Sequence, residues 1–154
     1  RAGLKMVYVG IESYNSTVLK NVNRFTVNND QQYQIIKKLK KNRIYVKSMF
    51  MFGLPDDTEE TIKKTIQYSK FLPNQLVQFS IFTPYPGTPS YNELSDKIIV
   101  QKLEEYNQYN LVYKHKFLNK EMIIKLKNIG YRKFYLNLRN LFVIFLSLTS
   151  FFRK

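Results

Sequence analysis

The chain has 154 residues, of which 44% are hydrophobic and 16% are aromatic. This composition excludes an intrinsically disordered chain, and the length allows one domain with its own core or part of a larger one. Lys and Arg number 25 against 11 Asp and Glu, so the formal net charge is +14. A basic chain can bind nucleic acid or anionic lipid, but lysines spread over every segment are also typical of a compositional bias on solvated surfaces.

No cysteine occurs in the sequence. The chain therefore contains no disulfide, no cysteine-held zinc and no iron–sulfur ligand. It begins at Arg1 without a signal-peptide pattern, and Arg1-Ala2-Gly3 is similar to the end of a helix with a glycine cap. We interpret the start of the sequence as a point in mid-fold.

The first predicted element is a β-strand over Leu4–Ile11, which ends at the polar pair Glu12 and Ser13. A short helix is predicted from Asn15 to Val22. A second helix is predicted to start at Asp30 as its N-cap and to carry a lysine-rich outer face.

The stretch Val46–Thr61 predicts a strand, a sharp turn and a new helix in direct succession. An apolar run ends at Gly53-Leu54-Pro55, and Asp57 is the expected N-cap, with Glu60 three residues further on. The helix is expected to reach about Leu72. Ligands bind at loops that follow the carboxyl ends of parallel strands, so this turn is a candidate site.

A third strand is predicted over Leu76–Phe82, followed by a rigid loop over Thr83–Pro89 that contains three prolines and a glycine. The order β-α-β-α-β with right-handed crossovers predicts three adjacent parallel strands with helices on one or both faces. The apolar strands read as buried on both faces, which argues against an RNA-binding sheet surface.

The remaining residues are predicted to be helical. One helix is expected over Ile98–Lys114, with Ile99, Leu103, Tyr106 and Tyr113 on a common face, and Asn119 is the expected N-cap of another. The apolar run Leu141–Phe152 is shorter than the roughly 20 residues that a membrane-spanning helix needs. It suits an interfacial segment or a helix packed on the rest of a larger protein.

Several short motifs follow one another in an order that resembles radical SAM enzymes. They are Gly10-Ile11-Glu12-Ser13, Arg24, Met51–Thr58 (MFGLPDDT) and Pro84–Thr88 (PYPGT). The closest resemblance is to the C-terminal half of members that carry a cobalamin-binding domain. Leu118–Glu121 and Tyr131–Tyr135 are similar to the helical region that follows the barrel in that group.

The resemblance implies an α/β fold, namely the C-terminal half of a partial (β/α)6 TIM-like barrel over residues 1–95. Residues 96–154 would form a helical extension with an apolar end. In this family a CxxxCxxC loop holds a [4Fe–4S] cluster, and S-adenosylmethionine (SAM) bound to it yields a 5′-deoxyadenosyl radical. Members with cobalamin often transfer a methyl group. We therefore expect a fragment of such an enzyme that binds no iron by itself, since it has no cysteine.

The resemblance also implies roles for particular residues. Glu12, with Ser13 in the same motif, is similar to the polar residue that binds the ribose or amino group of SAM, and Arg24 to the arginine that binds its carboxylate. The alternative for Glu12 is a solvated carboxylate in a loop, and the alternative for Arg24 is an ordinary surface arginine.

Three consecutive residues, Met51, Phe52 and Gly53, align with the adenine-binding strand, although ordinary core packing would also explain them. Asp56 departs from the family pattern, where glycine is frequent. Tyr85 is expected at the substrate side of the barrel mouth, or in a purely structural turn. His115, the only histidine, is expected to be structural.

The implied partners are a small-molecule or lipid substrate and a reducing protein such as ferredoxin or flavodoxin. Nucleic acid is not expected, and peripheral membrane contact through the apolar end remains an option for an otherwise cytoplasmic protein. Two alternatives stay open: a non-catalytic, degenerate relative, and a tRNA-modifying radical SAM enzyme.

Overall fold

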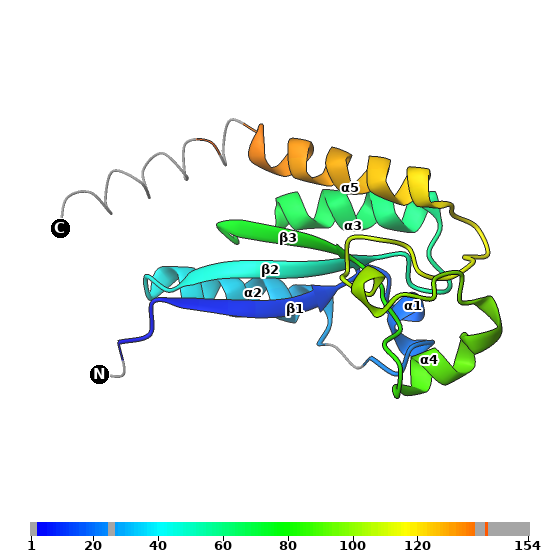
Figure 1. Ribbon diagram of the computed structural model, residues 1–154. Helices are drawn as coiled ribbons and strands as arrows, with labels where there is room; N and C mark the ends of the chain where they lie inside the picture. Colours follow the sequence, from blue (N-terminus) through cyan, green and yellow to red (C-terminus); the bar gives the residue numbers. More distant parts are fainter. Residues whose placement is uncertain (1–2, 25–26, 138–140, 142–154) are drawn as a thin grey trace.

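A parallel sheet of three strands forms the centre of the molecule. The computed structural model describes residues 3–24, 27–137 and 141. Strands β1 (Met6–Glu12), β2 (Tyr45–Phe52) and β3 (Leu76–Ile81) lie in the order β1-β2-β3, as Figure 1 shows. The predicted α/β fold with three adjacent parallel strands is confirmed.

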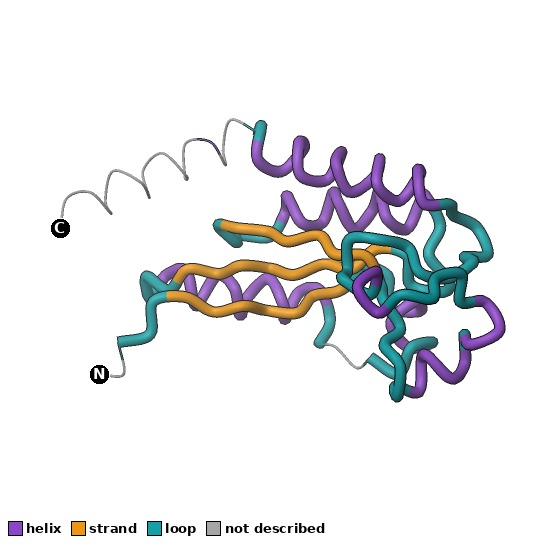
Figure 2. Tube along the Cα trace, in the orientation of Figure 1, coloured by secondary structure: helices purple, strands orange, loops and turns teal. Residues whose placement is uncertain are grey.

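Five α-helices accompany the sheet within the described residues (Figure 2). Helix α2 follows β1 in the chain, α3 follows β2, and α5 packs beside α3 (Figure 1). The helices are α1 (Ser16–Lys20), α2 (Asn29–Lys41), α3 (Glu59–Phe71), α4 (Pro89–Glu93) and α5 (Lys120–Tyr135), with short 3-10 turns at Ser95–Lys97 and Leu103–Glu105.

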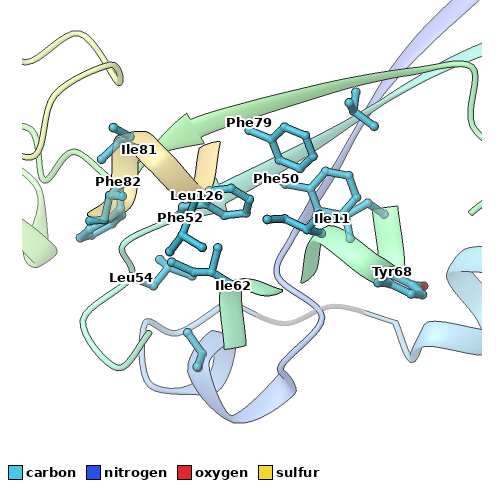
Figure 3. Close-up of a cluster of buried hydrophobic side chains, with 14 of the residues drawn as sticks. Ile11, Phe50, Phe52, Leu54, Ile62, Tyr68, Phe79, Ile81, Phe82 and Leu126 are labelled. Atoms are coloured by element: carbon cyan, nitrogen blue, oxygen red, sulfur yellow. The ribbon is translucent and has the colours of Figure 1, made fainter. Parts of the chain in front are cut away.

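One face of the sheet is buried and the other is only partly covered. Along β2, Phe50 and Phe52 are fully buried, whereas Met49 and Met51, which alternate with them, are partly exposed. The buried side chains join residues of α3 and α5 in one core, part of which is drawn in Figure 3. The prediction that the strands are buried on both faces is therefore wrong. Apolar residues at successive positions concealed the two-residue period, because methionine and phenylalanine look alike in a hydropathy pattern. We call the partly exposed side the open face.

Helix α3 starts one residue later than the predicted cap. Thr58 is its N-cap, since the Thr58 hydroxyl accepts a hydrogen bond from the Thr61 amide at 3.2 Å and the Thr61 hydroxyl accepts from the Thr58 amide at 2.9 Å. Asp57 instead turns back toward the preceding loop. The prediction of an Asp57 cap paired with Glu60 is wrong, because Thr61 completes the reciprocal cap that the pattern assigned to Glu60.

The N-cap of α2 also differs from the prediction. Asn28, not Asp30, accepts the hydrogen bond from the Gln31 amide, at 2.8 Å. Asp30 lies in the first turn, where its charge suits the positive end of the helix dipole. At Asn119 the predicted cap of α5 is confirmed.

Two tyrosine hydroxyls from α5 occupy the outer edge of β3. The Tyr131 hydroxyl accepts from the Phe79 amide at 3.1 Å and donates to the Phe79 carbonyl at 3.3 Å. Tyr135 pairs with Val77 in the same way, at 3.1 Å and 3.0 Å. The β3 edge is thus satisfied by side chains, whereas the outer edge of β1 pairs with no strand among the described residues.

No α-helix spans the described residues 98–114, so the helix predicted there is wrong. Of the four residues expected on one face, Ile99 and Leu103 are 59% and 72% exposed, whereas Tyr106 and Tyr113 are buried. Gln108 has a left-handed backbone with φ of 63°, which interrupts any helix, and its carbonyl accepts from the Ile81 amide at 2.8 Å. The segment is a loop laid against the end of β3, with an isolated antiparallel bridge from Ile98 to Tyr113.

Among the described residues, no helix has both the length and the apolar character needed to cross a membrane. The predicted apolar segment over Leu141–Phe152 lies outside these residues except for Leu141.

Candidate functional site

A cavity of about 270 Å³ lies where the three strands end. Glu12 reaches it from the end of β1 and Met51 from β2, and Tyr85 from the loop after β3. Arg24 and Gln108 add to its polar lining, together with Thr83, Thr88 and Ser90. We call it the strand-end cavity; its position is the one that the parallel-sheet topology predicts for a ligand.

Glu12 is held at the cavity by an irregular backbone. The register of β1 against β2 shifts between Gly10 and Glu12, and Glu12 has a left-handed φ of 63°. A side chain at residue 10 would bring its Cβ to 2.8 Å from the Glu12 carboxylate, so the carboxylate would have to move away from its present position. Backbone conformations of this kind cost about 1–3 kcal/mol and cluster at functional sites.

The carboxylate of Glu12 faces one cation. The Arg24 guanidinium lies 3.6 Å from it, too far for a hydrogen bond, and the side chains of Arg24 and Glu12 are 58% and 14% exposed. Burial raises the pKa of Glu12, and the charge of Arg24 opposes that rise. The two groups are close enough to share one zwitterionic ligand and loose enough for each to bind a different part of it.

Four side-chain contacts fix the Gly53-Leu54 turn below the cavity. The Asp57 carboxylate accepts from both amides at 3.0 Å. The Tyr113 hydroxyl donates to the Gly53 carbonyl at 2.7 Å, and His115 Nε2 lies 2.8 Å from the Leu54 carbonyl. Gly53 has a φ of 78°, so the turn itself requires glycine.

The protonation state of His115 follows from its contacts. Its Nδ1 accepts from the Phe117 and Leu118 amides at 3.1 and 3.2 Å, so the proton sits on Nε2 and is donated to Leu54. Burial lowers the pKa of His115. The histidine is thus a neutral clamp on the turn.

Asp57 is a buried carboxyl with three donors. Thr61 donates to it at 2.7 Å in addition to the Gly53 and Leu54 amides. Burial raises the pKa of Asp57 to about 6, because desolvation outweighs the stabilisation by these donors. Its charge therefore titrates just below neutral pH.

Comparison with known proteins gives the family. Residues 1–69 match the family described as the Radical SAM superfamily. The bacteriochlorophyllide d C-12(1)-methyltransferase of Chlorobaculum tepidum is 29% identical over 126 residues, which cover 81% of this chain and 27% of that protein. An uncharacterised methyltransferase of Pyrococcus horikoshii is 32% identical over 136 residues, 87% of this chain and 29% of that protein.

A third relative is a cyclase. The anaerobic magnesium-protoporphyrin IX monomethyl ester cyclase of Rubrivivax gelatinosus is 28% identical over 137 residues, 89% of this chain and 24% of that protein. This chain belongs to the radical SAM superfamily. It spans less than a third of the length of each of these relatives.

The structure of this radical SAM chain brings four of the predicted site residues together. They are Glu12, Arg24, Met51 and Tyr85, all of which line the strand-end cavity. The other three, Ser13, Phe52 and Gly53, do not line it. Ser13 is buried with its hydroxyl 3.3 Å from that of Thr65, Phe52 is buried against Phe79, and Gly53 forms the turn.

Other cavity residues of the radical SAM chain were not predicted, and Gln108 is the most polar of them. It was assigned to a helix, and no local pattern marks a glutamine that will adopt a left-handed backbone. Thr83 and Thr88 belong to the proline-rich loop, which is the sequence signal that could have identified them.

The described residues of this radical SAM chain hold no group of three His, Asp or Glu side chains that could bind a metal ion, and the sequence has no cysteine. The chain therefore does not fit an iron–sulfur cluster. The carboxylate, guanidinium and apolar wall of the strand-end cavity do fit an organic cation with a carboxylate.

Proposed function

We propose that this chain supplies the SAM-binding portion of a radical SAM enzyme whose [4Fe–4S] ligands lie outside the sequence. One observation carries the proposal: Glu12 and Arg24 present opposite charges to the same cavity, 3.6 Å apart. SAM carries an ammonium, ribose hydroxyls and a carboxylate, which are complementary to this pair.

The roles of the residues follow from their chemistry. Glu12 accepts hydrogen bonds from the ammonium or ribose hydroxyls of SAM, and Arg24 donates to its carboxylate. Met51 offers an apolar surface to the adenine. Gly53, held by Asp57 and Tyr113, keeps the cavity wall in place. SAM bound at a reduced cluster supplies radical chemistry at unactivated C–H bonds.

Methyl transfer is the proposed reaction class, because two of the relatives bear the name methyltransferase. Cobalamin dependence is a further proposal from the resemblance, and its binding domain would also lie outside this chain. A small-molecule or lipid substrate and a ferredoxin or flavodoxin reductant complete the proposal. The total absence of cysteine favours a second candidate, a non-catalytic relative that kept the fold.

Titration of SAM into the full-length protein, anaerobically loaded with iron and sulfide, tests the proposal. Replacing Glu12 with Gln or Arg24 with Gln should each weaken SAM binding by about tenfold or more, since each removes a charge-assisted contact. Glu93→Gln and Arg132→Gln are matched controls, because both positions are exposed and neither lines the cavity.

The two candidates separate in a second assay. A working enzyme yields 5′-deoxyadenosine from SAM on reduction, and the Glu12 and Arg24 variants yield less. A full-length protein that has no cysteine motif and makes no 5′-deoxyadenosine would be the non-catalytic relative. If wild type and all variants bind SAM with equal affinity, SAM does not bind in the strand-end cavity through Glu12 and Arg24.

A further inference from the structure

A second cavity, of about 200 Å³, lies on the open face beside β3. Its polar lining comes from two strands and from the loop that was predicted to be a helix. This lining includes Lys47, Gln78, Ser80, Asn107, Gln108 and Tyr109. We call it the polar recess.

The polar recess carries a positive charge and no negative charge. Lys47 lines it, and no carboxylate does. Lys47 forms none of the ion pairs found among the described residues; its ammonium lies over the Tyr8 ring, 5.2 Å from the centroid. Of the remaining polar groups, the amides of Gln78, Asn107 and Gln108 can donate hydrogen bonds, whereas the Ser80 hydroxyl already donates to the Phe50 carbonyl at 3.1 Å. One cation with neutral donors matches a singly charged anion better than a phosphate dianion.

An apolar strip joins the recess to the strand-end cavity. Lys47, Met49 and Met51 alternate along β2 and share the open face, opposite the buried side chains. Met51 lines the strand-end cavity, so the strip runs from the cation to the proposed cofactor site. Four residues of strand span about 13 Å. Gln108 lines both cavities and marks their common boundary.

Resting on the proposed function, we propose that the open face binds a substrate with a carboxylate at one end and an apolar body. The carboxylate lies at Lys47 in the polar recess, and the apolar body crosses Met49. The reacting carbon then lies beside Met51, next to the strand-end cavity. Neither the family match nor the relatives assign a role to the recess.

Gln108 is the positioning residue in this arrangement. Its left-handed backbone and the bond from the Ile81 amide hold it at the end of β3. Its amide can donate to the carboxylate side of the substrate while its position limits how far the apolar body enters the strand-end cavity.

The probes are cis-parinaric acid and its methyl ester, two fluorescent molecules with the same apolar body that differ in charge. They are titrated into the full-length protein. Replacing Lys47 with Met should weaken binding of the acid by about tenfold and change binding of the ester by less than about twofold, because only the ion pair is removed. Lys47→Arg should keep binding of the acid within about threefold.

Matched controls separate charge from position. Lys41→Met removes an exposed lysine on α2 and should leave both titrations unchanged. Met49→Asn should weaken the acid and the ester equally, since it makes the strip polar. Equal acid affinity in wild type and Lys47→Met would overturn the proposal, as would displacement of the acid from wild type by millimolar inorganic phosphate.

The failure of this inference is distinct from that of the proposed function. SAM titrated into the Lys47→Met protein should bind as in wild type, because Lys47 lies outside the strand-end cavity. If SAM binds normally but Lys47→Met does not weaken binding of the acid, the proposed carboxylate site in the recess is rejected and the proposed function stands. Absent SAM binding in every variant, wild type included, rejects the proposed function.

Discussion

Asp57 shows how one carboxyl holds the turn on which the site is built. It accepts from the amides of Gly53 and Leu54, and it lies one residue before the cap of α3. Sequence reasoning found that Asp57 belongs to this turn but gave it the wrong contact. A carboxylate oxygen can accept from amides in the first turn of a helix or from amides of the preceding loop. Here Thr58 and Thr61 bond each other reciprocally and form the cap, so Asp57 binds the loop amides instead.

The raised pKa of Asp57 predicts a pH dependence. The folded state binds this proton with a pKa of about 6, against an ordinary value of 3.8. Its contribution to stability is therefore largest below about pH 4 and falls as the pH rises through 6. A shift of this size corresponds to roughly 3 kcal/mol.

In Asp57→Asn this dependence should disappear. The measurement is the difference in the free energy of unfolding between wild type and variant, taken from pH 4 to pH 7. Taking the difference cancels the opposite trend of His115, whose lowered pKa makes stability rise with pH up to about its ordinary value. A difference that does not change with pH would contradict the assignment.

At the scale of elements, β3 ends the sheet because α5 covers its edge. Tyr131 and Tyr135 lie one turn apart on α5, and their hydroxyls bond both the amide and the carbonyl of Phe79 and Val77. Unpaired edges recruit other strands, and here side chains take the place of a neighbouring strand. Glycine at position 130 lets α5 approach, since a Cβ there would lie 3.1 Å from the Phe79 ring.

Removing these hydroxyls should expose the β3 edge. In Tyr131→Phe/Tyr135→Phe, we expect the amides of Val77 and Phe79 to exchange with deuterium about tenfold faster, because each loses an acceptor worth about 1 kcal/mol. Tyr33→Phe is the control, since its ring packs on Phe71 without a hydroxyl bond to the sheet. Unchanged exchange at both amides would show that the hydroxyls do not protect the edge.

At the scale of the whole molecule, the outer edge of β1 pairs with no other strand among the described residues. Tyr8 and Met6 on this strand are 65% and 39% exposed, and the open face beside them is only partly covered. A partial barrel explains both features, because a further strand would pair with β1 and the open face would line the interior of the barrel.

The 154-residue chain produced alone should bind no iron after anaerobic reconstitution, because it has no cysteine. It should also self-associate through β1. Iron analysis and light scattering check these two outcomes, with the full-length protein as the comparison. An intact cluster on the isolated chain would refute the fragment interpretation.

The amino-acid pattern alone was enough for the strand–helix alternation, the Gly53 turn and the order of the family motifs. These features depend on neighbours in the chain. Local patterns also placed Glu12 and Met51 at strand ends, where the sheet topology makes them meet.

The open face, the closed β3 edge, the clamp on the turn and the role of Gln108 emerged from packing. Tyr113 and His115 reach Gly53 and Leu54 across 60 and 61 residues of sequence, and Tyr135 reaches Val77 across 58. Such contacts produce no periodic pattern of apolar residues in the sequence, because each depends on where a distant element packs. For the same reason the sequence around Gln108 wrongly predicts a helix.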